Sequence, residues 1–295
     1  MTCVRTAWLD LDGTTVALED AAAGYFCTKL DLGAPVVREV LDNLPDQHGA
    51  VDRTAYMGSR AVSADVTAVA GAGAVVDDVA TMFGPFMVPT ARPVLHYVLD
   101  SGGTARERTL VVRPAAYDYA IEGDQQRDIH LGFVAADPIA RDPRVQSATA
   151  WAGFGSTPGR AYPLTFDRTY PAGGGVPTVA NLYSAGDVPI QPAVRIWGPI
   201  TGPAVTFTDA AGAVFRVPFV SSFTIAAGSF VDVDTKAHTA LYNGDPAQNM
   251  LTDIDWTSIA WPVLDPYVTW RMSLAGTATS GVTQVVATWQ DGYLS

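Results

Sequence analysis

The chain has 295 residues, of which 48% are hydrophobic and 16% are charged, and its 18 Lys and Arg against 30 Asp and Glu give a net charge of −12. This acidic balance argues against a nucleic-acid-binding protein, because phosphate recognition depends on clustered cations. The charged fraction lies below the usual quarter or so, which indicates that partners cover much of the surface. The length favours two domains.

Cysteine content and hydropathy exclude further classes of protein. Cys3 and Cys27 are the two cysteines, and they form neither a disulfide framework nor a metal-binding spacing. The first residues contain no apolar core of signal-peptide length, and no run of about 18 apolar residues is present that would span a membrane. We therefore expect a protein that is made in the cytoplasm, has no membrane segment, and holds no metal or cofactor.

The first half reads as short strands with one helix. Alternating apolar and polar residues between Gly, Asn, Asp and Pro are typical of antiparallel strands. Asp12-Gly13 is a favoured pair for a type I′ hairpin turn. An apolar stripe predicts one helix over residues 74–83, stopped by Gly84-Pro85. Strands are predicted within 4–20, within 25–40 as a strand pair broken at Gly33-Ala34-Pro35, and at 60–69, 93–99, 108–119 and 127–135.

The second half reads as a sandwich or barrel of short strands. Asp137-Pro138 and Asp142-Pro143 mark a junction, so we expect one domain over 1–137 and another over 138–295. Turn residues separate regularly spaced short strands, as in β-sandwiches and barrels. Two further apolar strands end the chain. The other predicted strands lie at 162–170, 192–197, 205–208, 214–220 and 224–225, with a hairpin over 228–251.

One short motif suggests phosphoryl transfer. Asp10-Leu11-Asp12-Gly13-Thr14 matches a signature of haloacid-dehalogenase-like phosphatases, in which the first Asp attacks phosphorus, the second transfers protons, and both hold Mg²⁺. That motif requires a parallel strand that feeds a helix, within alternating β and α units. Here a second strand-like segment follows directly, so we interpret Asp12-Gly13 as a hairpin turn and keep the Mg-dependent phosphatase as an alternative.

The remaining candidates have weaker patterns. Asp232 and Asp234 share one face of a strand, which indicates a solvated face more than a calcium site. The histidines are far apart in sequence, without metal-ligand spacing, and no Gly-x-Ser-x-Gly elbow occurs. Several tryptophans could form a sugar platform, although strand aromatics are more often core or interface anchors. These residues are His48, His96, His130 and His238, and Trp151, Trp197, Trp256, Trp261, Trp270 and Trp289.

One ordered set of residues in the second half forms a recognisable pattern. Its members are Asn181, Gly186, Pro192, Ile196, Gly198-Pro199, Pro203, Gly228, Val231-Asp232-Val233-Asp234-Thr235, Asn243-Gly244 and Trp261-Pro262. This set resembles the distal tail protein (Dit) of long-tailed phages, and it is similar to the compact type that occurs as a minor tail protein of actinobacterial phages. The likeness covers most of residues 105–295, and in the first hundred residues it is confined to the order of the elements.

This resemblance implies a mainly β protein with no enzymatic activity. The first domain would be a split β-barrel with one helix, six copies of which close a ring around the tail channel. The second would be a galectin-like β-sandwich, and the last strand returns to the first domain in some relatives. The ring would join the tail tube protein to the tail-tip hub protein and other minor tail proteins at the distal end of the virion tail. DNA would pass through it without specific binding.

Two further expectations concern ligands. An acidic channel wall would repel DNA and let it slide, and our candidates for that wall are Asp42, Asp46, Asp52 and Asp65. The chain contains no insertion long enough for a carbohydrate-binding module, and the sugar site of galectins does not usually accompany this fold. A lectin-like receptor-binding protein, acting through the second domain, stays open as an alternative.

Overall fold

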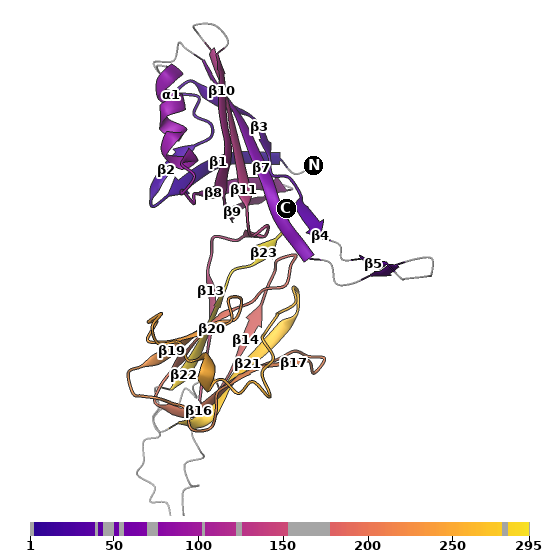
Figure 1. The fold of residues 1–295 in the computed structure, drawn as a ribbon, viewed down its shortest axis with the longest axis vertical. Coiled ribbons are helices and arrows are strands. Elements are labelled where there is room, and N and C mark those ends of the chain that lie inside the picture. Colours follow the sequence, from indigo (N-terminus) through magenta and orange to yellow (C-terminus); the bar gives the residue numbers. More distant parts are fainter. Residues whose placement is uncertain are drawn as a thin grey trace, which may run out of the picture. The chain divides into compact units, whose positions relative to one another are not determined.

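The computed structural model describes residues 3–38, 41–43, 50–52, 56–69, 76–101, 104–121, 126–152, 178–278 and 283–294 (Figure 1). These residues form mainly antiparallel strands and one α-helix, α1 (Val76–Phe83), which confirms the predicted fold class. The chain divides into two compact units. The first unit comprises Met1–Pro143 with Tyr293–Ser295, and the second comprises Arg144–Gly292. No helix in the described part is long and apolar enough to cross a membrane.

The first sheet of unit 1 contains the predicted N-terminal hairpin. Asp12 and Gly13 both have positive φ, 52° and 84°, as a type I′ turn requires, and Asp10 Oδ1 accepts a hydrogen bond from Gly13 N at 3.0 Å. The hairpin prediction is therefore confirmed. The strand order is β2 (Thr14–Ala17), β1 (Cys3–Leu11), β8 (Val94–Ser101), β9 (Thr104–Val111), β12 (Ala140–Arg141) and β23 (Gly292–Tyr293).

The second sheet of unit 1 is built around one long strand, β7 (Tyr56–Val69). Its order is β10 (Arg113–Ile121), β11 (Gln126–Ala135), β7 and β3 (Tyr25–Asp31), and β4 (Pro35–Arg38) also pairs with β7. A separate ribbon joins β5 (Leu41–Asn43) to β6 (Ala50–Asp52). The strand pairs of the described residues do not close these sheets into a barrel, which agrees with the expected split form.

One apolar core holds unit 1 together. The two sheets contribute alternate side chains such as Leu9, Tyr97 and Leu131, and α1 contributes Phe83. Each of these side chains is almost fully buried, and burying Leu9, Leu131 or Phe83 contributes roughly 1.5–3 kcal/mol. The core is therefore the main source of stability, and the opposite sheet faces are available for other roles.

Two local predictions for the first half, both about strands, are corrected by the structure. The predicted strand 108–119 is two strands, β9 and β10, which belong to different sheets and meet at the buried Val112. The predicted strand pair within 25–40 is β3 and β4, which both pair with β7 and not with each other. The helix is followed by a 3₁₀ turn, η1 (Gly84–Met87), because Pro85 fits the start of such a turn. Residues 74 and 75 lie outside the described residues.

Unit 2 is a sandwich of two five-stranded sheets. Its core joins Ile196 and Val233 of one sheet to Phe207 and Trp270 of the other, which confirms the predicted sandwich. The predicted strand 162–170 lies outside the described residues. The first sheet has the order β13 (Gln146–Trp151), β22 (Gln284–Trp289), β15 (Ala193–Trp197), β19 (Phe230–Asp234) and β20 (Thr239–Tyr242). The second has β14 (Val179–Tyr183), β21 (Thr269–Ala278), β16 (Ile200–Thr208) and β17 (Val214–Pro218), with β18 (Thr224–Ile225) paired to β16.

The hairpin of β19 and β20 confirms the prediction for 228–251. The two strands pair antiparallel, and the Asn243-Gly244 turn that follows has positive φ at both residues. Asn243 Oδ1 accepts a hydrogen bond from Phe230 N at 3.0 Å, so this side chain ties the turn to the first strand of the hairpin. A short 3₁₀ helix, η2 (Leu251–Asp253), comes next.

We predict that Gly198→Ala destabilises unit 2 by about 2 kcal/mol or more. A Cβ at this position would overlap the backbone carbonyl oxygens of Ile225 and Ala226, which cannot move aside as a flexible side chain can. Gly84→Ala is the control, because its added Cβ meets nothing within 4 Å. Chemical denaturation of the full chain measures both changes. Equal stability of the two variants would contradict the close approach at Gly198.

Candidate functional site on the first unit

The outer side of the β10-β11-β7-β3 sheet is polar. In β7, Val62, Ala64 and Val66 are buried, and the alternate residues point away from the core. In β11, His130 is likewise exposed between the buried Ile129 and Leu131, and in β3 the exposed Lys29 and Asp31 flank the half-buried Leu30. We call this surface the polar face. It consists of Lys29, Asp31, Ser63, Asp65, Thr67, Asp118, Asp128 and His130.

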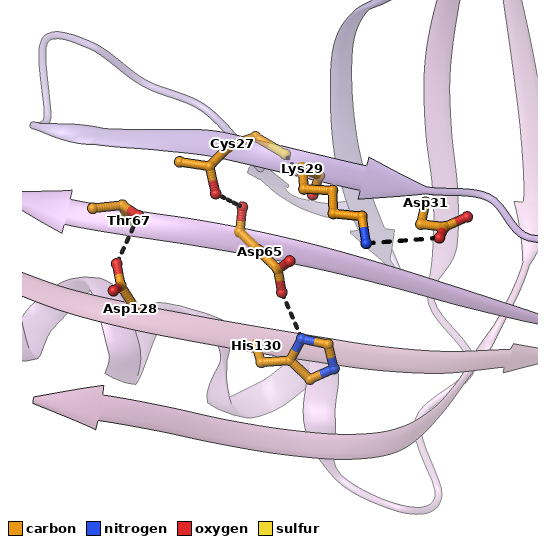
Figure 2. Close-up of polar contacts among 8 residues, drawn as sticks. Cys27, Lys29, Asp31, Asp65, Thr67, Asp128 and His130 are labelled. Carbon is orange, nitrogen blue, oxygen red and sulfur yellow. Dashed lines mark hydrogen bonds and ion pairs between the residues drawn. The ribbon is translucent and has the colours of Figure 1, made fainter.

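Cross-strand register aligns one row of charged side chains across the polar face. Lys29 pairs with Asp65, Asp65 with His130, and His130 with Asp118. Asp65 Oδ1 lies 2.6 Å from His130 Nδ1 (Figure 2). Both side chains are 40–48% exposed, so this contact contributes at most about 1 kcal/mol. Lys29 reaches along its own strand, and its Nζ lies 3.9 Å from Asp31 Oδ2.

A shallow hollow of about 370 Å³ lies on the polar face. Thr67 Oγ1 donates a hydrogen bond to Asp128 Oδ1 at 2.7 Å, and Thr28 Oγ1 donates to the backbone oxygen of Asp65 at 3.1 Å. Among the lining residues that the structure describes are three carboxylates, of Asp65, Asp118 and Asp128, and one imidazole, with no Lys or Arg. The electrostatics of the hollow therefore disfavour anions such as phosphate groups.

Cys27 lies on the inner side of the same sheet, opposite Val66, and is half-buried. Its Sγ lies 3.5 Å from the backbone oxygen of Lys29. Burial raises the pKa of the Cys27 thiol, and the nearby carboxylates of Glu19 and Asp65 act in the same direction. The thiol is therefore protonated at neutral pH, and it is a poor nucleophile.

The structure places one of the four predicted channel residues on the polar face, namely Asp65. Asp42 and Asp52 lie in the separate β5-β6 ribbon, where their side chains are outside the described part, and Asp46 is outside the described residues. The four residues are thus not brought together by the described strands. Sequence reasoning did not select Asp118 or Asp128, and it did not place His130 beside Asp65. Polar residues at alternate positions of β7 and β11 could have indicated this exposed sheet face.

The Asp10 motif does not have the structural context of a phosphatase. The strand that carries it, β1, pairs antiparallel with both β2 and β8, whereas the phosphatase motif ends a parallel strand and leads into a helix. Asp10 instead stabilises the hairpin turn through its hydrogen bond with Gly13 N. In the part of the chain that the structure describes, no group of three or more His, Cys, Asp or Glu side chains could hold a metal ion.

We predict that Cys27 reacts slowly with iodoacetamide at pH 8, and that its rate is still rising at pH 9. A raised pKa leaves a smaller thiolate fraction than in a free cysteine, and the thiolate is the reacting species. The measurement uses a Cys3→Ser background, with the unfolded chain in denaturant as the control. Labelling of the folded protein as fast as that of the unfolded chain would contradict the raised pKa of the half-buried thiol.

Comparisons with known proteins give a likeness of structure alone. No family model matches the sequence, and no curated protein matches it either. The crystal structure of SPP1 Dit (gp 19.1), described as a paradigm of the hub adsorption apparatus in phages that infect Gram-positive bacteria, matches with a TM-score of 0.61 at 12% identity. The match covers 98% of this chain and 100% of that one.

Two structures of the phage P2 baseplate in its activated conformation, with Ca and with Sr, are also similar. Their TM-scores are 0.47 and 0.46, at 12% identity, and the matches cover 97% and 96% of this chain and 98% and 97% of those chains. These scores lie below the level that indicates a shared fold, whereas the score of SPP1 Dit lies above it. At that score and coverage, the chain has the fold of a phage distal tail protein.

Proposed function

We propose that the protein is a structural component of a phage virion, a Dit-like adaptor that forms a homohexameric ring. The ring joins the tail tube protein to the tail-tip hub protein and surrounds the DNA channel at the distal end of the tail. The observation that supports this most strongly is the likeness to SPP1 Dit over 98% of the chain. The protein would be made in the host cytoplasm and would act in the virion without catalysis.

Free sheet edges in unit 1 provide a way to close such a ring. Among the described strands, β10 and β3 form the two ends of one sheet, so the outer edge of each has no strand partner. Exposed edges pair readily with other strands. Pairing of β10 in one copy with β3 or β4 in the next would continue the sheet from subunit to subunit, and such head-to-tail contacts generate rings.

Exposed apolar residues lie at one of these edges. Val36 and Val37 in β4 are 59% and 58% exposed, and Met57 opposite Val37 is 43% exposed. Successive residues of a strand point to opposite faces, so neither face of β4 is covered at this point. A neighbouring subunit that covered β4 would bury this apolar surface, and the low charge content of the chain agrees with extensive burial between subunits.

The polar face is the surface that we assign to the channel. A continuous sheet around a ring has one face toward the axis. The three carboxylates around its hollow, Asp65, Asp118 and Asp128, would repel DNA phosphates in every subunit. Tight binding would stall DNA during ejection, so a wall that repels weakly suits a passage. Of the four channel residues predicted from the sequence, Asp65 is the one on the polar face, so it is the one that would line the channel.

The first test is self-assembly of the purified full chain. We expect wild type to form hexamers by mass photometry, and Val37→Asp to stay monomeric because a carboxylate in an apolar interface costs several kcal/mol. Val214→Asp is the matched control, because Val214 is also an exposed strand valine, at 52%, but lies in unit 2. A strictly monomeric wild type that is also absent from the tail end of virions would contradict the ring.

The second test concerns the channel wall. We expect hexameric wild type to show no measurable affinity for duplex DNA at low salt, and the double variant Asp65→Lys, Asp128→Lys to bind it. Each ring of the variant gains many positive charges in one confined surface, so binding should weaken steeply as salt rises. Asp209→Lys with Asp245→Lys in unit 2 gives the same net charge as the control. Equal DNA binding by both double variants would contradict the placement of the polar face.

A further inference from the structure

The outer face of the β13-β22-β15-β19-β20 sheet in unit 2 has a hollow of about 640 Å³. Two cross-strand rows form it. Arg195 lies between Val286 and Asp232 in the first, and Ala193 lies between Thr288 and Asp234 in the second. Because Ala193 is far shorter than the side chains around it, the sheet surface is depressed at this point. The side chains that point into the hollow from this face include Ala193, Arg195, Trp197, Asp232, Asp234 and Thr239.

Arg195 is held in a fixed orientation at the centre of this face. Its Nε and Nη2 donate hydrogen bonds to Asp232 Oδ1 and Oδ2 at 2.6 and 2.8 Å, which is a bidentate pair. Its guanidinium also lies over the Phe230 ring, 4.1 Å from the centroid. These bonds use two of the five N–H donors of the guanidinium, so a preoriented group retains donors for a ligand.

An aromatic pair borders the hollow. The rings of Trp197 and Phe230 have centroids 4.9 Å apart and are tilted by 52°, and Trp197 also lines the hollow. On the other side, Asp234 Oδ1 accepts the backbone N–H groups of Lys236 and Ala237, both at 2.9 Å, which fixes that carboxylate. One surface thus combines an aromatic ring with hydrogen-bond donors and acceptors. Hydrogen bonds fix the donors of Arg195 and the acceptor of Asp234, and Trp197 packs against Phe230.

The charges of the hollow restrict the ligand. Arg195 is neutralised by Asp232, and Asp234 leaves the lining slightly negative, so anionic ligands are disfavoured. A cation would meet the guanidinium at the centre. A purely apolar ligand would displace water from the remaining N–H donors of Arg195 and from the second carboxylate oxygen of Asp234 without replacing those hydrogen bonds. The ligand that fits best is neutral. It has an apolar face that can stack on Trp197 and several hydroxyl groups that can bond to the polar side chains.

We propose that this face of unit 2 is a binding site for a neutral saccharide, with one pyranose ring stacked on Trp197 and its hydroxyl groups bound by Arg195 and Asp234. A sugar ring offers an apolar C–H face and adjacent hydroxyl groups, which matches the mixture found here. The proposal does not depend on the ring assembly, because all of its residues come from one unit of one chain.

The test is binding of the labelled full chain to an array of neutral and acidic oligosaccharides, followed by titration of any saccharide that is retained. We expect neutral saccharides to bind, with millimolar affinity for a single shallow site, on the order of 4 kcal/mol. Trp197→Ala should weaken binding about tenfold or more. Trp256→Ala should leave it unchanged, since Trp256 is 56% exposed in the same unit but does not line the hollow.

A second variant keeps the proposal testable if the Trp197→Ala variant does not fold. Ala193→Ile places a larger side chain in the hollow at an exposed strand position, so it should block the saccharide and leave the melting temperature unchanged. Ala275→Ile, on the other sheet of unit 2, is the matched control. The proposal is overturned if no neutral saccharide binds, if acidic saccharides bind as well as neutral ones, or if Ala193→Ile leaves binding intact.

Discussion

Backbone hydrogen bonding at the edges of sheets is the constraint on which this structure depends. Nearly all of the described secondary structure is strand, and a strand satisfies its N–H and C=O groups through neighbours and not within itself. The core of unit 1 fixes the order β10-β11-β7-β3, and that order leaves β10 and β3 at the ends. In the proposed ring, identical subunits would pair with these outer edges, so the strand order that the core stabilises would also set where subunits meet.

Turn chemistry made part of this fold predictable from the sequence. Asp12-Gly13 and Asn243-Gly244 adopt positive φ at low cost, so the turn of the N-terminal hairpin and the turn after β20 both followed from two adjacent residues. Pairing between distant segments was not predictable in the same way. The alternation of β9 runs into that of β10 without a visible break, and nothing near Val112 indicates a change of sheet. Likewise, β3 and β4 look like a hairpin locally, although both pair with β7.

In the candidate site, too, single residues could be predicted from the sequence but their pairing across strands could not. Asp65 could be selected as an exposed strand carboxylate, but its contact with His130 joins residues that are 65 positions apart. The row from Lys29 to Asp118 exists because four strands have one particular register. A shift of any one strand by one residue would turn its member of the row toward the core. The hollow in unit 2 likewise depends on register, which places the small Ala193 between Thr288 and Asp234.

The two units provide surfaces of different chemistry. Three carboxylates line the hollow of the polar face, whereas the hollow of unit 2 combines Trp197 with a preoriented Arg195. A single shallow saccharide site would be weak. Repetition of that site in a ring would raise its effective affinity by multivalency, because several copies could engage one polysaccharide surface. Assembly through unit 1 would therefore increase the effect of any binding by unit 2.

A cryo-EM map of the assembled protein, in purified form or at the tail tip of virions, tests the central claim most directly. The account predicts that β10 of each copy forms ladder hydrogen bonds with β3 or β4 of the next, and that Asp65 and Asp128 point toward the lumen. A map in which these edges face solvent, or in which subunits meet through other surfaces, would contradict it.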